Sequence, residues 1–194
     1  MSRVQYYCAM SLDGFIAESD DTIEWLTSYS PSGEYEGAPD DEAPMPGAYL
    51  RFYDGVGALV SGSVTYDFVR RDVEGGGEWP YRDKPFWLLT TRDLPIVEGD
   101  GVDIRVVRGA VRDHVDEMMR SAGGKNLWVL GGGNVASQFA DEGLLDEVIV
   151  TVVPVVLGNG KPLFDRRLPG GAMRLTDVRP YAIGMVELTY EIRR

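Results

Sequence analysis

Cysteine and histidine are nearly absent from this sequence of 194 residues, which contains one of each, Cys8 and His114. A single cysteine excludes a disulfide within the chain and any metal site built from several cysteines. Cys8 lies in an apparent buried strand and His114 at an outward-facing helical position, so we interpret both as structural residues. We therefore expect no metal centre.

Basic residues and long hydrophobic runs are also scarce. The 19 basic residues are outnumbered by 31 acidic ones, giving a net charge of −12 that repels a phosphate backbone and disfavours nucleic acid as a partner. An anionic ligand would have to be held by local donors. No apolar run approaches the roughly 20 residues that cross a bilayer. No secretion signal is recognisable at the N-terminus, so we expect a cytoplasmic protein.

The remaining composition is that of an ordinary globular domain. With 44% hydrophobic and 26% charged residues in 194, the chain can form one domain over residues 1–194 with one core. Strands and helices alternate over the first two thirds, which predicts an α/β fold whose mostly parallel sheet is covered on both faces. The strand-rich C-terminal part predicts antiparallel strands at one edge. We expect strands near 4–9, 58–61, 84–91, 104–107, 126–130, 148–157, 174–179 and 185–192, and helices near 48–53, 63–69, 112–121 and 135–142.

A short helix is predicted after the first strand and its turn. Asp20 and Asp21 can cap its N-terminus, with Ile23 and Leu26 facing inward and Trp25 at one edge. The segment that follows contains four prolines, three glycines and no basic residue. We interpret this segment as a long surface loop that is either a lid or disordered. It runs over residues 30–47 and carries the acidic residues Glu34, Glu36, Asp40, Asp41 and Glu42.

Three consecutive glycines, Gly131–Gly133, separate a predicted buried strand from a helix. They allow the backbone to approach a ligand closely, and the helix N-terminus offers N–H groups and a positive dipole end to a pyrophosphate. With Ala136 they match the loose pattern G-x-G-x-x-A, although glycine also serves tight packing. Asp146 and Glu147 precede the next strand instead of ending it, so the sequence does not predict a Rossmann domain.

A second strand-to-helix turn contains Gly62, Ser63 and Thr65. Backbone donors and hydroxyl groups at this helix start form a second candidate phosphate site, with an ordinary helix cap as the alternative.

A third polar group, Thr90, Thr91 and Arg92, follows the strand predicted over residues 84–91. The forked guanidinium of Arg92 suits the additional phosphate of NADP, and an isolated surface arginine is the alternative.

The order of these segments resembles one known family. The pieces "SLDGFIA", "GSVTYDFV", "WLLTTR" and "LWVLGGGNVASQFADEGLLDEVIVTVVPVVLGNGKPLF", followed by a closing hairpin, resemble the dihydrofolate reductase-like family. The resemblance is closest to the RibD C-terminal (reductase) domain of riboflavin biosynthesis proteins. It covers nearly the whole chain and is most specific over residues 127–164.

This resemblance implies an oxidoreductase that forms a homodimer and transfers hydride from NADPH to a pyrimidine-ribose substrate, similar to 5-amino-6-(5-phosphoribosylamino)uracil, or to a pterin-like one. It implies that the Gly131–Val135 segment holds the pyrophosphate and that Ala9 and Ile16 flank the nicotinamide, under a loop containing Asp13 and Gly14. The full set of implied cofactor residues is Ala9, Ile16, Gly62, Ser63, Thr65, Thr90, Thr91, Arg92, Gly131, Gly132, Gly133, Asn134 and Val135.

Two departures from the family pattern bear on function. Ser63 stands where the family often has arginine, and Pro46 and Gly47 occupy the neighbourhood of the acid that dihydrofolate reductases use, which argues against folate reduction. A catalytically inactive nucleotide- or flavin-binding module of the same fold is therefore the alternative hypothesis. A third hypothesis is an interaction protein whose acidic loop docks a basic partner.

No residue identifies itself as the proton donor for such a reaction. By position, Asp13, Glu24, Tyr49 and Tyr66 are candidates. Trp25 and Tyr49 are candidates to line the substrate pocket, although aromatic residues are more often part of the core.

Overall fold

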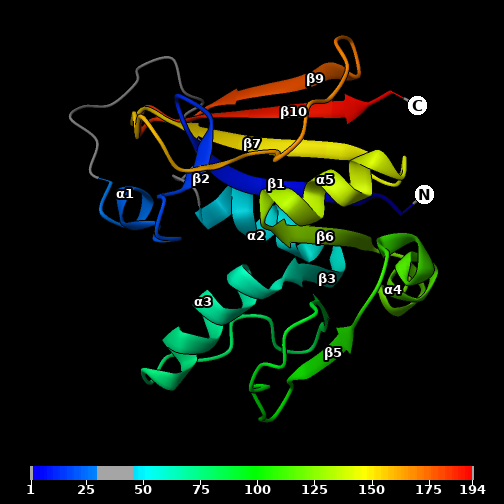
Figure 1. Ribbon diagram of the computed structural model, residues 1–194. Coiled ribbons are helices and arrows are strands. Elements are labelled where there is room, and N and C mark those ends of the chain that lie inside the picture. Colours follow the sequence, from blue (N-terminus) through cyan, green and yellow to red (C-terminus); the bar gives the residue numbers. More distant parts are fainter. Residues whose placement is uncertain (1, 30–45, 194) are drawn as a thin grey trace.

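The fold is built on one central sheet. The computed structural model describes residues 2–29 and 46–193. Eight strands form this sheet in the order β5-β4-β3-β6-β1-β7-β10-β9 (Figure 1). Their bounds are β1 Val4–Ser11, β3 Val56–Gly62, β4 Pro85–Leu89, β5 Asp103–Val107, β6 Asn126–Gly131, β7 Glu147–Val153, β9 Met173–Pro180 and β10 Val186–Ile192.

The sheet is mixed, with its antiparallel strands at one edge. From β5 to β7 every neighbouring pair is parallel, whereas β10 runs antiparallel to both β7 and β9. The predicted mostly parallel sheet with antiparallel C-terminal strands is therefore confirmed.

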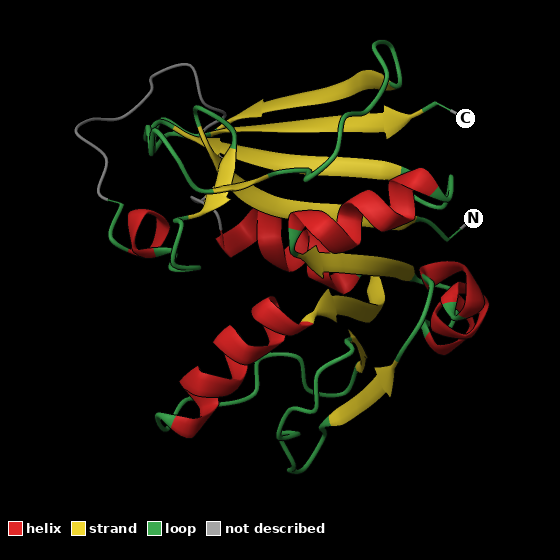
Figure 2. Cartoon of the chain, in the orientation of Figure 1, coloured by secondary structure: helices red, strands yellow, loops and turns green. Residues whose placement is uncertain are grey.

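Helices cover both faces of the sheet, as the alternation of elements predicted (Figure 2). Figure 1 shows α5 on the near side of the sheet and α2 on the far side. The bounds are α1 Glu24–Thr27, α2 Pro46–Asp54, α3 Ser63–Glu74, α4 Val115–Ser121 and α5 Gly133–Asp141, with a 3-10 turn η1 at Val111–Asp113. None of these described helices is long and apolar enough to cross a membrane.

Alternation along the strands gives each face its own core. On one face, α4 and α5 bury Met118 and Phe139 against aliphatic side chains such as Val60 and Val129. The other face is aromatic, and α2 and α3 pack there against rings from β1, β4 and β6. Its members include Tyr7, Phe52, Tyr66, Trp79, Tyr81, Phe86 and Trp128.

The first helix differs from its prediction. Its N-cap is Ile23, with no capping side chain, and the side chain of Asp20 accepts hydrogen bonds from Thr22 instead. Asp21 adopts a left-handed conformation with φ of 70°, which turns the chain before the helix begins. Trp25 is the buried residue of this helix and not its edge.

Three other elements also differ. The helix predicted over 112–121 is divided into η1 and α4 at His114, and β7 ends at Val153 because Pro154 has no backbone N–H for pairing. A small second sheet, in which β2 (Phe15–Ala17) pairs with β8 (Lys161–Pro162), was not predicted. The acidic loop expected over 30–47 lies almost entirely outside the described residues.

Candidate active site

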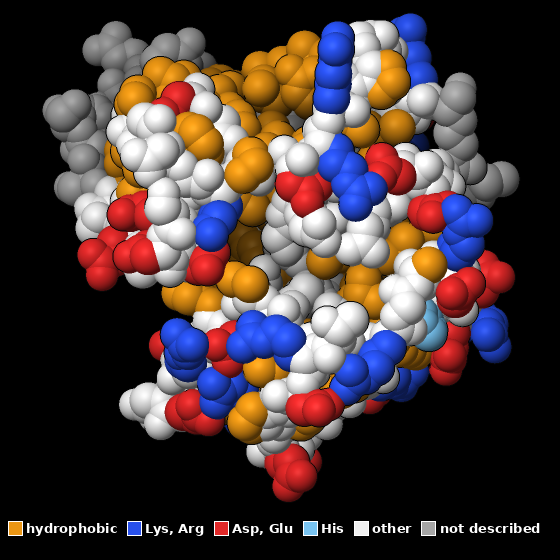
Figure 3. Space-filling model, in the orientation of Figure 1, with side chains coloured by type: hydrophobic (Ala, Val, Ile, Leu, Met, Phe, Trp, Pro, Cys, Tyr) orange, Lys and Arg blue, Asp and Glu red, His pale blue; other side chains and the backbone are white. Residues whose placement is uncertain are grey.

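A cavity of about 890 Å³ lies where β1, β3, β4 and β6 end. Figure 3 shows a hollow on this side of the molecule with hydrophobic side chains on its floor. The carboxyl ends of parallel strands meet at one edge of a sheet, which is a common place for ligands in α/β folds. The residues lining the cavity include Ala9, Ile16, Gly62, Ser63, Thr65, Thr90, Thr91, Gly131, Gly132, Gly133, Asn134 and Val135.

The glycine turn brings the start of α5 to the wall of this cavity. Gly132 is the N-cap, and the Gly131–Gly132 peptide bond is cis. A Cβ atom on Gly133 would lie 2.5 Å from the carbonyl oxygen of Pro162 and 2.9 Å from that of Leu163. Only glycine fits this approach. The first N–H groups of a helix have no partner within the helix, so this turn offers donors to an anion.

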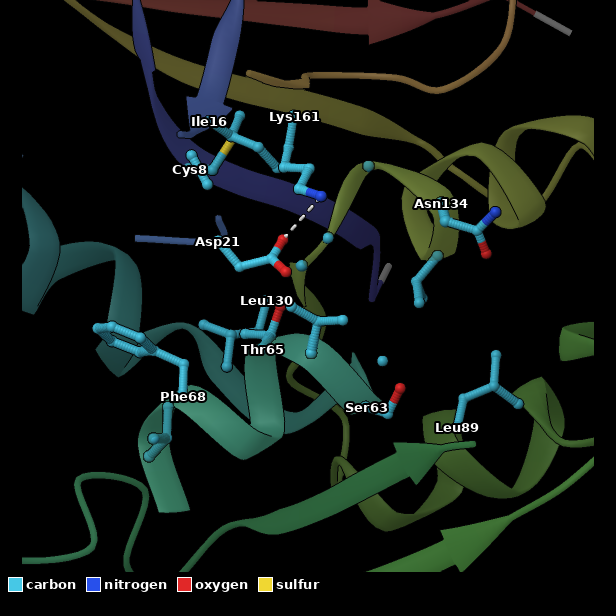
Figure 4. A pocket seen from close by; sticks show the side chains of 18 of the residues that line it. Cys8, Ile16, Asp21, Ser63, Thr65, Phe68, Leu89, Leu130, Asn134 and Lys161 are labelled. Atoms are coloured by element: carbon cyan, nitrogen blue, oxygen red, sulfur yellow. Dashed lines mark ion pairs between the residues drawn. The ribbon is translucent and has the colours of Figure 1, made fainter. Parts of the chain in front are cut away.

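The start of α3 faces the same cavity. Gly62 ends β3 and is the N-cap of α3, so two helix N-termini meet there. A Cβ on Gly62 would lie 3.1 Å from a methyl group of Val135, and one on Gly131 would lie 3.1 Å from the hydroxyl of Thr65. The two turns thus pack closely together, with Thr65 between them (Figure 4).

Only part of the third predicted group, Thr90, Thr91 and Arg92, lines the cavity. Thr90 and Thr91 line the cavity, whereas Arg92 is exposed and is not among its lining residues. The backbone N–H of Arg92 donates to the hydroxyl of Thr90 at 2.9 Å. The guanidinium of Arg108 donates to the carbonyl of Thr91 at 2.7 Å, so two arginines flank this end of the cavity.

The loop after β1 is tied to a distant segment by Asp13. Its carboxylate accepts hydrogen bonds from Ser11 and from the backbone N–H groups of Leu157 and Gly158. The Ser11 hydrogen bond is the main reason that the pKa of Asp13 lies below its usual value. Asp13 is exposed and does not line the cavity, so in this arrangement it fastens the loop.

The other proton-donor candidates also lie outside the cavity lining. Glu24 is exposed on α1. Tyr49 stacks on Tyr53 with 5.6 Å between ring centroids, and the fully buried Tyr66 donates to the carbonyl of Pro95 at 2.8 Å. Trp25 packs into a separate core cluster and lines no part of the cavity. The structure therefore gathers the predicted cofactor residues, except Arg92, and none of the predicted catalytic or substrate-pocket residues.

Aromatic residues that the sequence did not single out form the inner wall. Tyr7, Tyr81 and Trp128 all line the cavity. The hydroxyl of Tyr7 donates to the Glu187 carboxylate at 3.2 Å. Burial, followed by the charge of Glu187, raises the pKa of Tyr7 well above its usual value. Tyr7 could have been predicted from the sequence as a cavity residue, because it lies two residues before Ala9 in one strand and so faces the same side of the sheet.

Three charged residues line the cavity among those described, Asp21, Lys161 and Asp165. Lys161 pairs with Asp21 at 3.3 Å (Figure 4). Asp165 accepts a hydrogen bond from Asn134 at 2.5 Å. Burial acts to raise the pKa of Asp165, but hydrogen bonds from Asn134 and Ser137 outweigh it and the pKa is lowered.

Comparison with known proteins places this chain in a family. The model of the RibD C-terminal domain matches residues 79–186. The uncharacterized protein YwjB of Bacillus subtilis is 32% identical over 175 residues, which are 90% of each chain. The uncharacterized protein YyaP of the same organism is 24% identical over 194 residues, covering 97% of this chain and 94% of the relative.

Solved structures agree with this assignment. A putative riboflavin biosynthesis protein from Shewanella sp. PV-4 superposes with a TM-score of 0.78 at 25% identity over the whole of both chains. Dihydrofolate reductase from Enterococcus faecalis, complexed with NADP(H), gives 0.58 at 14% identity over 99% of this chain and 97% of its own. The chain belongs to the RibD C-terminal domain family and has the fold shared by dihydrofolate reductases.

Proposed function

We propose that this protein is an NADPH-dependent reductase that transfers hydride to a pyrimidine-ribose or pterin-like substrate. The observation that carries the proposal is the meeting of two helix N-termini, those of α3 and α5, in one cavity at the carboxyl ends of parallel strands. Family membership supports it. A relative of known structure from Thermotoga maritima is a diaminohydroxyphosphoribosylaminopyrimidine deaminase and 5-amino-6-(5-phosphoribosylamino)uracil reductase, with a TM-score of 0.64 at 14% identity over 99% of this chain and 57% of its own.

The residues present fit a dinucleotide. Gly131, Gly132 and Gly133 line the cavity without side chains, so the backbone before and at the start of α5 can approach a pyrophosphate closely. In this proposal the Gly131–Val135 segment and the start of α3 hold phosphate, and Thr91 and Arg92 hold the adenosine side. Ala9 and Ile16 flank the nicotinamide. When bound, NADPH supplies the hydride, and the protein orients the two reactants.

The aromatic wall suits a planar substrate ring. Tyr7, Tyr81 and Trp128 are each less than a tenth exposed, so a ring bound against them is shielded from water. We add Tyr7 as the candidate proton donor, because Tyr7 lines the cavity and the candidates from the sequence do not. Glu187 would orient this hydroxyl.

A homodimer remains part of the proposal. The outer strand β9 exposes Leu175 and Val178, with 48% and 51% of their surfaces accessible. Apolar side chains at a sheet edge favour association with a second copy.

The alternative function is an inactive nucleotide- or flavin-binding module. It is favoured by Ser63, which cannot supply the charge of the arginine that the family often has there. It is also favoured because the described part of the inner wall that Tyr7, Tyr81 and Trp128 form contains no carboxylate residue.

The first test is a titration of the pure protein with NADPH and NADH, followed by nicotinamide fluorescence and thermal shift. We expect binding of NADPH, then consumption of NADPH when 5-amino-6-(5-phosphoribosylamino)uracil or dihydrofolate is added. Binding without turnover of either substrate class would favour the inactive module. No binding of either nucleotide would refute the reductase.

A further inference from the structure

The cavity assigned to a phosphate-bearing ligand has little positive charge. Among the described residues that line it, Asp21 and Asp165 are acidic and Lys161 alone is basic. The whole chain adds a net charge of −12. Apart from Arg92 and Arg108 at one end, the groups that can attract phosphate charges to this cavity are therefore the helix N-termini and the Lys161 ammonium group.

Lys161 is held beside the glycine turn by its neighbours in the chain. It pairs with Ala17 in the small sheet of β2 and β8. The next two residues, Pro162 and Leu163, place their carbonyl groups against Gly133 at the start of α5. In Figure 4 the Lys161 ammonium group points toward the Asp21 carboxylate, with which it is paired. Lys161 and the start of α5 therefore line the same cavity, and the segment that follows Lys161 packs directly against Gly133.

The present partner of Lys161 is a weak one. The Asp21 and Lys161 side chains are 3.3 Å apart and remain 42% and 46% exposed. Exposed ion pairs of this kind contribute little, because water screens them and both side chains lose freedom. A phosphate carries more charge than one carboxylate and would also accept hydrogen bonds from the helix start, so it is the stronger partner.

We infer that Lys161 is the phosphate-binding cation of this cavity and that Asp21 occupies it while no ligand is bound. Binding exchanges one partner for the other: the ammonium group turns from the Asp21 carboxylate to a phosphate oxygen, and no covalent bond changes. The inference rests on the proposed function only in taking the phosphate from the cofactor. The phosphate of a sugar-phosphate substrate would serve the same chemistry.

The test compares Lys161→Met, Lys161→Arg and Asp21→Asn with the wild type in titrations with NADPH, NADH and ribose 5-phosphate. We expect Lys161→Met to weaken NADPH and NADH equally, by about ten-fold, because both contain the pyrophosphate. Lys161→Arg should restore most of the affinity. Asp21→Asn should strengthen binding by about two- to three-fold, since the competing carboxylate is gone.

Two controls separate this effect from others. Lys125→Met removes the same charge from an exposed lysine that does not line the cavity, so it should leave all three affinities unchanged. Arg92→Ala should weaken NADPH and not NADH, if Arg92 holds the additional phosphate. Thermal unfolding of each variant checks that it is folded.

The outcomes distinguish the two proposals. A loss confined to ribose 5-phosphate supports Lys161 and assigns it to the substrate. Wild-type affinity of Lys161→Met for all three ligands overturns the inference and leaves the reductase proposal standing. Failure of the wild type to bind either nucleotide refutes the reductase, while the sugar-phosphate titration still decides the role of Lys161.

Discussion

The two sides of the cavity are built from different parts of the polypeptide. On the side assigned to the cofactor, the wall is largely backbone, formed by the turns at Gly62 and Gly131–Gly133. On the side assigned to the substrate, the wall is formed by large side chains such as Tyr7, Tyr81 and Trp128. A backbone wall tolerates few substitutions at its glycines, whereas a side-chain wall can change its specificity by replacement of single residues.

Loss of an aromatic anchor on the substrate side should have the largest effect. Trp128 is 5% exposed, packs edge-on against Phe52 at 5.2 Å and donates its indole N–H to the Tyr7 carbonyl. We expect Trp128→Ala to reduce the free energy of unfolding by about 3–5 kcal/mol, from lost burial and the cavity left behind. Urea denaturation measures it. A loss below 1 kcal/mol would mean that this wall is not part of the core.

Adding one methyl group at Gly133 tests the side of the cavity that is formed by backbone. Gly133→Ala places a Cβ where the Pro162 carbonyl oxygen lies, so the turn or β8 must shift. We expect a destabilisation of about 1–3 kcal/mol and weaker NADPH binding. Gly170→Ala is the matched control, because a Cβ there meets nothing within 4 Å. Equal behaviour of the two variants would contradict the close-approach argument.

Removing the Tyr7 hydroxyl tests the substrate side of the cavity and leaves the cofactor side unchanged. Tyr7→Phe keeps the ring and removes the hydrogen bond to Glu187. We expect unchanged NADPH affinity, a stability change of about 1 kcal/mol or less, and turnover reduced by about ten-fold or more once a substrate is found. Tyr66→Phe, whose hydroxyl lies outside the cavity, should not reduce turnover. Normal turnover of Tyr7→Phe would remove Tyr7 as the donor.

Alkaline pH should weaken the aromatic core selectively. Burial raises the pKa of Tyr53 to about 12 and raises those of Tyr7 and Tyr81 further. Above about pH 10 the unfolded chain releases these protons and the folded chain keeps them, so stability falls as pH rises. The free energy of unfolding, measured between pH 8 and pH 11, should decline, with a smaller slope in Tyr81→Phe.

The smallest effect concerns Cys8, which is partly buried and lines the cavity. Burial raises the pKa of its thiol to about 12, so almost none of it is thiolate at neutral pH. A thiol reagent should therefore modify the folded protein slowly and the urea-unfolded protein rapidly. Equal rates would show that this part of the wall opens to solvent.

Much of the backbone side could be predicted from the sequence, because its signals are local. Glycines between a strand and a helix fix a turn and a helix start within five residues of chain, as at Gly131–Gly133. The other side depends on pairing between distant segments. Nothing near Lys161 in the sequence indicates that it forms an ion pair with Asp21. Tyr7 can donate a hydrogen bond to Glu187 only because β10 lies next to β7 in the sheet. Arg92 was expected at the cavity because it follows the two threonines, but the chain turns outward after Thr91.

The place of β1 in the sheet also has a consequence for how the chain folds. Val4 pairs with Leu127 and Gln5 with Glu147, so the first strand to be synthesised has neighbours more than 120 residues away. Contacts this distant in sequence close large loops and slow folding. During synthesis β1 would wait, unpaired, until β6 and β7 have left the ribosome. A chaperone that shields the adjacent aromatic residues Tyr6 and Tyr7 of β1 would act in that interval.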